Sequence, residues 1–383
     1  MKLYLVTALL TALVTFGLSW VVWKVALRYK IYPPIRERDV HTRPTPRLGG
    51  IAMFLGVAVA FAFSSGNGGF ALIWSDPAPM LAVLGATLLI VLVGVADDLW
   101  DLDWMIKLGA QLIAAGIIVW FGQLQISSLP IGGMTVGSSW MSFALTVIAI
   151  VLVMNAVNFI DGLDGLVAGV CLIANGIFFV YSYLLVRDIG ASTYFNLASF
   201  VAVVLIGACA GFLPFNWHPA KMFMGDAGAL MLGLLMATSA VAITGQIQPA
   251  MLDPALFGRS QLLGAFIPIL LPVAVVMLPL LDFGLAVVRR LRAGTSPFSP
   301  DRKHLHHRML DLGHSDLGAV LIFYAWAAVI GMAVLLMYIA TRENWYGQYW
   351  IGVAFGVVGV AACLVVTFLP GRRRRPFPPE EAP

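Results

Sequence analysis

The sequence has few charged residues. Only 11% of its 383 residues are Asp, Glu, Lys or Arg, against about 25% in soluble domains, and 60% are hydrophobic. A chain this apolar cannot bury its hydrophobic surface in a core of its own size, so the bilayer is the expected solvent. The net charge of +4 does not indicate a nucleic-acid partner, because the basic residues gather in segments between apolar runs. We therefore predict an integral membrane protein with no nucleic acid bound.

Cysteine is scarce as well. Cys171, Cys209 and Cys363 lie in separate apolar runs, and no two of them form a CxxC pair. We expect them to be small buried hydrophobic side chains. The zinc-protease motif HExxH is also missing, which argues against an intramembrane metalloprotease.

Long apolar stretches fill most of the chain. A helix needs about 20 mostly apolar residues to cross a bilayer, and eleven stretches qualify. They lie near residues 3–23, 49–65, 80–96, 105–122, 141–158, 165–186, 194–214, 227–245, 263–288, 317–340 and 349–369. We predict an all-α polytopic membrane protein with about eleven transmembrane helices. The first stretch has no clear cleavage site and is interpreted as a retained helix rather than a signal peptide.

The basic residues predict the orientation of these helices. If the segment after the first span is cytoplasmic, the cytoplasmic segments hold 19 Lys and Arg residues and the outer segments hold 4. Cytoplasmic loops of membrane proteins carry this excess. The N-terminus is therefore predicted outside and the C-terminus in the cytoplasm. The outer loop 123–140 has the alternation and Gly-Gly pair that allow one small hairpin.

The second cytoplasmic loop contains the motif VADDLWD, residues 95–101. Asp97 and Asp98 close the third span, at a helix C-terminus, where negative charge is disfavoured. On a helical turn Asp101 shares a face with both of them. Like charges this close repel each other unless a cation lies among them, and oxygen ligands suit Mg²⁺. The motif predicts a functional site rather than a solvated helix end.

The third cytoplasmic loop contains NAVNFIDGLDG, residues 155–165. Its polar residues recur every three positions: Asn155, Asn158, Asp161 and Asp164. Helix packing through the asparagines is an alternative interpretation. Carboxylates at a membrane boundary are costly without a partner, so we favour a functional role.

The fourth cytoplasmic loop contains PAKMFMGDAG, residues 219–228. Asp226 opens the eighth span, where a carboxylate is a plain helix cap or, between glycines, a metal ligand beside phosphate-binding N–H groups. Lys221 is a candidate phosphate contact. His218, just before the motif, is interpreted as a surface residue.

The first cytoplasmic loop contains HTRPTPRLGG, residues 41–50. Arg43 and Arg47 would bring positive charge to the membrane surface. Gly49 and Gly50 would bring bare backbone there, since glycine permits close approach. Alone, this motif is a weak signal.

The fifth cytoplasmic loop carries histidines among basic residues. They are His304, His306 and His307 beside Arg302 and Lys303. Neighbouring cations would repel a zinc ion, whereas the mixture suits an anion such as a diphosphate. Loops on one face thus bring acids for a hard cation and bases for phosphates, which is what phosphoryl transfer needs.

In this order and spacing, the motifs PRLGG, VADDLWD, NAVNFIDGLDG, PAKMFMGDAG and HLHH resemble those of the polyprenyl-phosphate N-acetylhexosamine-1-phosphate transferases. The resemblance runs from about residue 41 to 310 and includes the eleven-span layout. The HTRPTPRLGG and HLHHR forms resemble the branch that uses UDP-GlcNAc and undecaprenyl phosphate to start O-antigen (lipopolysaccharide) and other cell-envelope polysaccharides. Phospho-MurNAc-pentapeptide transferases typically show TPTMGG and three consecutive histidines instead.

The resemblance implies a reaction and its site. GlcNAc-1-phosphate would pass from UDP-GlcNAc to polyprenyl phosphate and release UMP, on the cytoplasmic face of a bacterial inner membrane. Residues 1–371 would form one integral membrane transferase domain, followed by a basic, then Pro- and Glu-rich cytoplasmic tail, residues 372–383. The cofactor would be Mg²⁺, with Mn²⁺ able to substitute. The implied metal ligands are Asp226 and Asn158, the catalytic residues Asp97, Asp98, Asp161 and Asp164, and the substrate contacts His304, His306, His307, Arg302, Lys303, Asn155, Lys221 and Lys107.

Other functions stay open at this point. Within the family they are a phospho-MurNAc-pentapeptide transferase or a transferase for another UDP-HexNAc. From another class, a membrane transporter would carry its charges near mid-span, whereas the acids here lie at span ends. Two mechanisms also stay open, direct attack by the lipid phosphate with Asp97 as base, or an Asp nucleophile with a phosphosugar–enzyme intermediate. A homodimer is an open possibility for the assembly.

Overall fold

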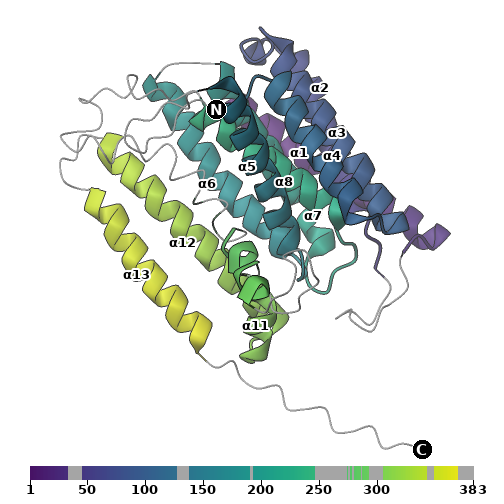
Figure 1. The fold of residues 1–383 in the computed structure, drawn as a ribbon, viewed down its shortest axis with the longest axis vertical. Coiled ribbons are helices and arrows are strands. Elements are labelled where there is room, and N and C mark those ends of the chain that lie inside the picture. Colours follow the sequence, from purple (N-terminus) through teal and green to yellow (C-terminus); the bar gives the residue numbers. More distant parts are fainter. Residues whose placement is uncertain are drawn as a thin grey trace, which may run out of the picture.

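The structure is a computed structural model that describes residues 1–32, 45–126, 138–189, 193–245, 274, 277, 280–285, 287–292, 305–342 and 349–369. This part of the chain is a bundle of helices (Figure 1). The long helices are α1 (Lys2–Tyr29), α2 (Gly49–Ser65), α3 (Pro77–Trp100), α4 (Trp104–Trp120), α5 (Ser139–Phe159), α6 (Leu166–Ile189), α7 (Thr193–Asn216), α8 (Gly225–Thr244), α12 (Asp316–Arg342) and α13 (Tyr349–Phe368). The short elements are the 3₁₀ turn η1 (Gly68–Phe70) and helix α11 (Leu305–Asp311).

These long helices coincide with ten of the eleven predicted spans. Within the described residues, eight of them are long and apolar enough to cross a membrane, and α2 and α4 are apolar but only 17 residues long. The prediction of an all-helical polytopic membrane protein is therefore confirmed at this level. The ninth predicted span, 263–288, lies largely outside the described residues, and so do most of the predicted hairpin at 123–140 and the whole tail at 372–383.

Helix α8 is the centre of the bundle. Nearly every one of its residues is buried, and it packs against α2, α3, α5 and α7. Glycines allow this close packing: a Cβ on Gly94 of α3 would collide with the backbone of Ala227, and one on Gly233 would lie 2.6 Å from the Cα of Met154 on α5. Small residues at such crossings are the usual way for membrane helices to associate.

Helix α1 reverses the pattern of a soluble amphipathic helix. Its buried face is a row of small hydroxyl residues, Thr7, Thr11, Thr15 and Ser19. Leu5, Leu9 and Leu13 are exposed, as expected for side chains that face lipid. The hydroxyl of Thr11 donates to the backbone oxygen of Thr7 at 2.7 Å, which satisfies it inside the bundle. This row packs against α2 and α7.

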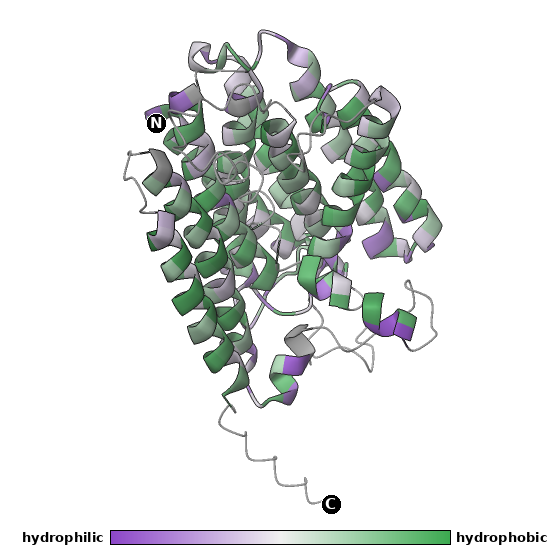
Figure 2. Ribbon diagram, turned by 60° about the vertical axis from the view of Figure 1, so that its left-hand side comes forward, coloured by the Kyte–Doolittle hydropathy of each residue, from purple (hydrophilic) through white to green (hydrophobic). Residues whose placement is uncertain are grey.

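Polar residues gather at one end of the bundle. Helices α3, α5 and α7 end there and α4, α6 and α8 begin there, and Figure 2 shows the hydrophilic colours concentrated at the lower end. Exposed tryptophans mark both ends, with Trp100 and Trp104 near the polar end and Trp120, Trp140 and Trp350 at the other. Such belts are typical of the two membrane–water interfaces. The polar end therefore lies at a membrane surface, where lipid and water-soluble substrates can meet.

Candidate active site

The turn between α3 and α4 holds Asp97 and Lys107 together. Helix α3 ends at Trp100, and Asp101 follows in the left-handed conformation, its φ 55°. Oδ1 of Asp97 accepts a hydrogen bond from the backbone N–H of Leu102 at 2.8 Å. Its Oδ2 accepts one from Nζ of Lys107 at 3.0 Å. The tight turn thus brings the first turn of α4 back over the end of α3.

Asp98 caps a different helix from the one that carries it. Its Oδ1 lies 3.2 Å from the backbone nitrogen of Asp226, and its Oδ2 lies 3.5 Å from that of Ala227. The preceding Gly225 has a φ of +69°, and a Cβ there would collide with the Asp98 carboxylate. Negative charge is stabilised at a helix N-terminus. The two N–H groups at the start of α8 therefore offset part of the cost of an acid at the C-terminal end of α3.

Asp226 lies at the centre of the cluster. Nδ2 of Asn158, from the last turn of α5, donates to its Oδ1 at 3.0 Å. Nζ of Lys107 lies 3.6 Å from its Oδ2. The two residues predicted as metal ligands are thus neighbours although they lie 68 positions apart in the sequence. Asp97, Lys107, Asp226 and Asn158 form one continuous chain of contacts.

The PRLGG segment runs alongside the approach to α8. The backbone N–H of Phe223 donates to the carbonyl of Pro46 at 2.8 Å. The N–H groups of Gly49 and Gly50 donate to the carbonyls of Phe223 and Met224 at 3.0 and 2.9 Å. The bare backbone expected of the two glycines is thus present. This backbone faces the start of α8. The sequence had instead predicted that it faces the membrane surface.

Asp164 ties the third loop to the fourth. Its Oδ2 accepts from the backbone N–H of Ala220 at 2.9 Å and lies 3.0 Å from Nδ1 of His218. Asn216 adds a second tie, accepting from the N–H of Gly165 at 3.1 Å. His218 is exposed, as expected, yet its pairing with Asp164 was missed. These contacts fix the loop that leads into Asp226.

Asp161 lies between α5 and α6, outside the helices. Burial raises the pKa of its carboxyl to about 7, and the negative charge of Asp226 adds to the rise, while the positive charge of Arg47 lowers it. Without a bound cation, this environment therefore favours the protonated carboxyl more than water does. A positive charge nearby would favour its ionised form.

Asn155 lies one helical turn from Asn158 and pairs with a residue that the sequence reading overlooked. Its Nδ2 donates to Oε1 of Gln111 on α4 at 2.6 Å, and Nε2 of Gln111 lies 3.4 Å from its Oδ1. The available signal was a lone glutamine, four residues after Lys107, in an otherwise apolar helix.

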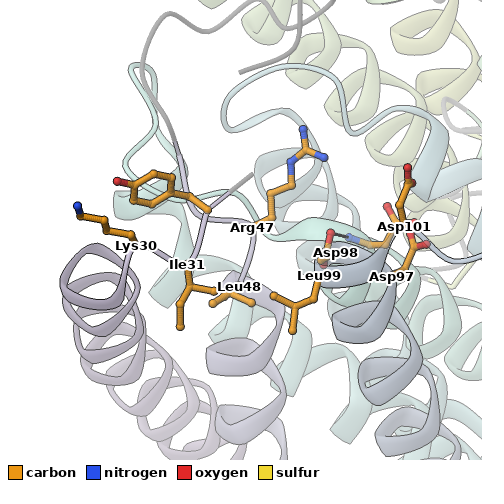
Figure 3. A pocket seen from close by; sticks show the side chains of 10 residues that line it. Lys30, Ile31, Arg47, Leu48, Asp97, Asp98, Leu99 and Asp101 are labelled. Carbon is orange, nitrogen blue, oxygen red and sulfur yellow. Dashed lines mark hydrogen bonds between the residues drawn. The ribbon is translucent and has the colours of Figure 1, made fainter. Parts of the chain in front are cut away.

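A cavity of about 340 Å³ opens beside the cluster. Figure 3 shows Lys30 and Ile31 at the end of α1 on one side and the acids on the other, with Arg47 between them. The lining residues are Lys30, Ile31, Tyr32, Arg47, Leu48, Asp97, Asp98, Leu99, Asp101 and Asp226. The lining thus includes basic residues from the end of α1 and the PRLGG segment as well as carboxylates from α3 and α8, so an anion and a cation could be held together.

The donors at Asp226 fit Mg²⁺. Among the described residues, no three His, Cys, Asp or Glu side chains gather as an all-protein metal cage. Mg²⁺ is usually held by one or two carboxylates, with substrate phosphates and water completing the shell. Asp226 supplies a carboxylate, and the Asn158 amide, turned by half a rotation, would present its oxygen to the same ion.

The remaining predicted contacts are not joined to this cluster within the described residues. Nζ of Lys221 lies 5.7 Å from the ring centre of Trp23 on α1, and the side chain is exposed. His306 and His307 fall in α11, but their side chains lie outside what the structure describes. Arg302, Lys303 and His304 lie outside the described residues altogether. Their roles remain predictions.

Comparison with known proteins shows to which family the chain is similar. Residues 80–244 match the model of Glycosyl transferase family 4. The decaprenyl-phosphate N-acetylglucosaminephosphotransferase of Mycolicibacterium smegmatis is 40% identical over 375 residues, which cover 96% of this chain and 88% of that protein. A probable undecaprenyl-phosphate N-acetylglucosaminyl 1-phosphate transferase of Bacillus subtilis is 31% identical over 88% of this chain and 84% of its own length.

A more distant relative covers the same length. The undecaprenyl-phosphate alpha-N-acetylglucosaminyl 1-phosphate transferase of Escherichia coli K12 is 28% identical over 96% of this chain and 93% of its own length. The similarity therefore extends over the whole helical bundle and includes the site at its polar end. By these matches the chain belongs to glycosyl transferase family 4, the polyprenyl-phosphate N-acetylhexosamine-1-phosphate transferases that its motifs resemble.

Proposed function

We propose that this protein transfers GlcNAc-1-phosphate from UDP-GlcNAc to a polyprenyl phosphate, with Mg²⁺ as cofactor, on the cytoplasmic face of a bacterial plasma membrane. The observation that carries the proposal is the meeting of Asp97, Lys107, Asn158 and Asp226, from four different helices, at the polar end of a bundle of this family. The names of the relatives support transfer of an N-acetylglucosamine phosphate group to a polyprenyl phosphate.

The reaction exchanges one phosphorus–oxygen bond for another. A terminal oxygen of the lipid phosphate attacks the β-phosphorus of UDP-GlcNAc, the bond from that phosphorus to the bridging oxygen breaks, and UMP leaves with both bonding electrons. The bond between the sugar and its phosphate is untouched. Such a transfer depends on positioning and charge neutralisation rather than on covalent chemistry by the protein. Mg²⁺ held by Asp226 and Asn158 would neutralise the diphosphate charge.

Lys107 supplies a second positive charge at the same place. Its ammonium lies between the carboxylates of Asp97 and Asp226 at 3.0 and 3.6 Å. A phosphate that approaches Asp226 therefore meets a cation already oriented by two acids. Arg47, on the facing wall of the cavity, adds positive charge on the other side of the incoming phosphate.

The contacts of the acids favour a single displacement. The Asp97 carboxylate accepts hydrogen bonds from Lys107 and from the backbone N–H of Leu102. The Asp98 carboxylate accepts a hydrogen bond from the backbone N–H of Asp226 at the start of α8. A carboxylate so occupied is a poor nucleophile. The lipid phosphate is mostly dianionic at neutral pH, since its second pKa is about 6, so it needs little help from a base. We expect inversion at the transferred phosphorus, measured with a chiral thiophosphoryl donor, whereas retention would indicate a covalent enzyme intermediate.

The deciding experiment is transfer by the purified protein in detergent from radiolabelled UDP-GlcNAc to undecaprenyl phosphate, with and without Mg²⁺. We expect labelled lipid and released UMP only with Mg²⁺, and a loss of at least about 100-fold in Asp226→Ala, as for other groups that stabilise transition-state charge. Asp76→Ala, which removes the carboxylate that caps α3 at the opposite end, is the matched control and should retain activity.

The donor is tested in the same assay. If the folded protein labels no lipid from UDP-GlcNAc but does so from UDP-MurNAc-pentapeptide or another UDP-HexNAc, the reaction class stands and the sugar assignment is wrong. If no donor is used at any Mg²⁺ concentration, the transferase proposal itself is contradicted.

A further inference from the structure

Gln111 is a buried polar residue in an apolar helix, and nothing in the proposed chemistry uses it. Its side chain is 4% exposed and lies on α4, one turn below Lys107. Its amide exchanges two hydrogen bonds with Asn155 of α5, one of 2.6 Å and one of 3.4 Å. An amide buried without partners would be costly. The pairing therefore fixes these two side chains opposite each other.

The pair forms the lower of two cross-links between α4 and α5. Gln111 and Lys107 are four residues apart, so they share a face of α4, and Asn155 and Asn158 are three apart on α5. The upper link runs from Lys107 through Asp226 to Asn158. Both links thus depend on the same alignment of the two helices.

We propose that Gln111 is a positioning residue, which pairs with Asn155 to hold α4 against α5 so that the ammonium of Lys107 stays between Asp97 and Asp226. A lysine side chain has a flexible stem of four carbons, so the place of its ammonium depends on where the helix beneath it is held. Apolar contacts alone allow helices to slide, whereas a reciprocal amide pair is directional. The structural part of this inference stands without the proposed function, and only its effect on catalysis rests on that function.

The first test measures Lys107 without using the reaction. The purified protein is treated with an acetylating amine reagent, and modification of each lysine is followed by mass spectrometry. In Gln111→Leu we expect Lys107 to react several-fold faster than in the wild type, while the exposed Lys24 and Lys221 react as before. Gln125→Leu is the matched control, because Gln125 also donates a hydrogen bond, to Val119 at the far end of α4, and should leave Lys107 unchanged.

A paired exchange separates the amide contact from general damage. Gln111→Asn combined with Asn155→Gln keeps both amides and the summed side-chain length. We expect it to restore the slow reaction of Lys107. An unchanged rate at Lys107 in folded Gln111→Leu would overturn the proposal, and so would a folded exchange variant in which Lys107 stays as reactive as in Gln111→Leu.

Activity gives the second readout. Gln111→Leu should lower kcat by about 10-fold or more, as small misplacements of catalytic groups do, because the displaced ammonium of Lys107 is the cation that meets the incoming phosphate. An equal loss in Gln125→Leu would contradict a specific role. If the wild type transfers nothing, the proposed function fails, and the lysine reactivity still decides the role of Gln111.

Discussion

The carboxylates of this site are held in different ways. Asp97 and Asp98 each accept hydrogen bonds from groups that favour a negative charge, and Asp164 is tied to the fourth loop. Asp161 is half-buried close to the charge of Asp226, and loss of contact with water raises the pKa of its carboxyl to about 7. At the scale of residues, Asp161, which lies in the loop between α5 and α6 and outside the membrane-spanning helices, carries a pH-dependent prediction.

Without a bound metal, Asp161 should make the fold less stable as pH rises. Its ordinary pKa is about 3.9, so between that value and about 7 the folded state holds a proton that the unfolded chain has lost. Stability falls with rising pH wherever the folded state binds more protons. We expect thermal unfolding in EDTA to shift to lower temperature from pH 5.5 to 8 in the wild type, and less in Asp161→Asn. Parallel pH profiles for the two proteins would contradict this assignment.

Gly225 is the residue that lets Asp98 reach α8. Its φ of +69° disfavours any side chain, and a Cβ would collide with the Asp98 carboxylate and the backbone oxygen of Arg47. Gly225→Ala should therefore cost about 1–3 kcal/mol of stability and remove most transferase activity. Gly66→Ala, at the other end of the bundle with open space around its Cβ position, is the control. Thermal unfolding and the transfer assay measure both effects, and equal behaviour of the two variants would sink the argument.

At the scale of elements, α3 offers a test of how closely it must approach α8. Gly94 and Gly85 lie on the same helix, but a Cβ on Gly94 would collide with the backbone of Ala227, while one on Gly85 meets nothing. Gly94→Ala should destabilise the protein by about 1–3 kcal/mol, because overpacking forces backbone shifts. Gly85→Ala should be neutral or stabilise by up to about 1 kcal/mol through helix propensity. Unfolding temperatures of the two variants measure the difference, and a similar shift in both would argue against tight α3–α8 packing.

The extents of the helices could be predicted because the bilayer sets them. Runs such as 49–65 and 227–245 coincide with α2 and α8 to within two residues, since apolar length is a local property of the chain. The contacts between helices could not be predicted in this way. The charge of Asp98 was predicted to be disfavoured at the end of its helix. Its partners at the start of α8 lie 128 and 129 positions away, and no local pattern indicates them.

The site was predicted in part. That Asn158 and Asp226 belong together came from the resemblance of the motifs to a family, and the structure places them 3.0 Å apart. Gln111 was missed because it belongs to no motif. Its only signal is polarity inside an apolar run, and its meaning depends on Asn155 across the helix interface. A single polar residue inside an apolar span is thus a candidate for hydrogen bonding to a polar residue of a neighbouring helix.

At the scale of the whole molecule, the distribution of basic residues predicts which membrane face carries the site. The 19 to 4 distribution of Lys and Arg predicts that the loops around Asp226 are cytoplasmic. Aromatic belts at both ends agree with a bundle that spans the bilayer but do not distinguish the faces. The orientation therefore needs a chemical test on the intact protein.

The chain offers a clean background for that test, because its three cysteines are buried and should not react with a membrane-impermeant maleimide. Ser75 precedes α3 at the end opposite the site, and Ser315 precedes α12 at the site end, and both side chains are exposed. We expect Ser75→Cys to be labelled in intact cells and Ser315→Cys only after the membrane is permeabilised. The same chemical change is made at both positions, so each variant controls for the other. The reverse pattern would place Asp226 on the outer face, away from a cytoplasmic supply of nucleotide sugar, and would contradict both the predicted orientation and the proposed site of reaction.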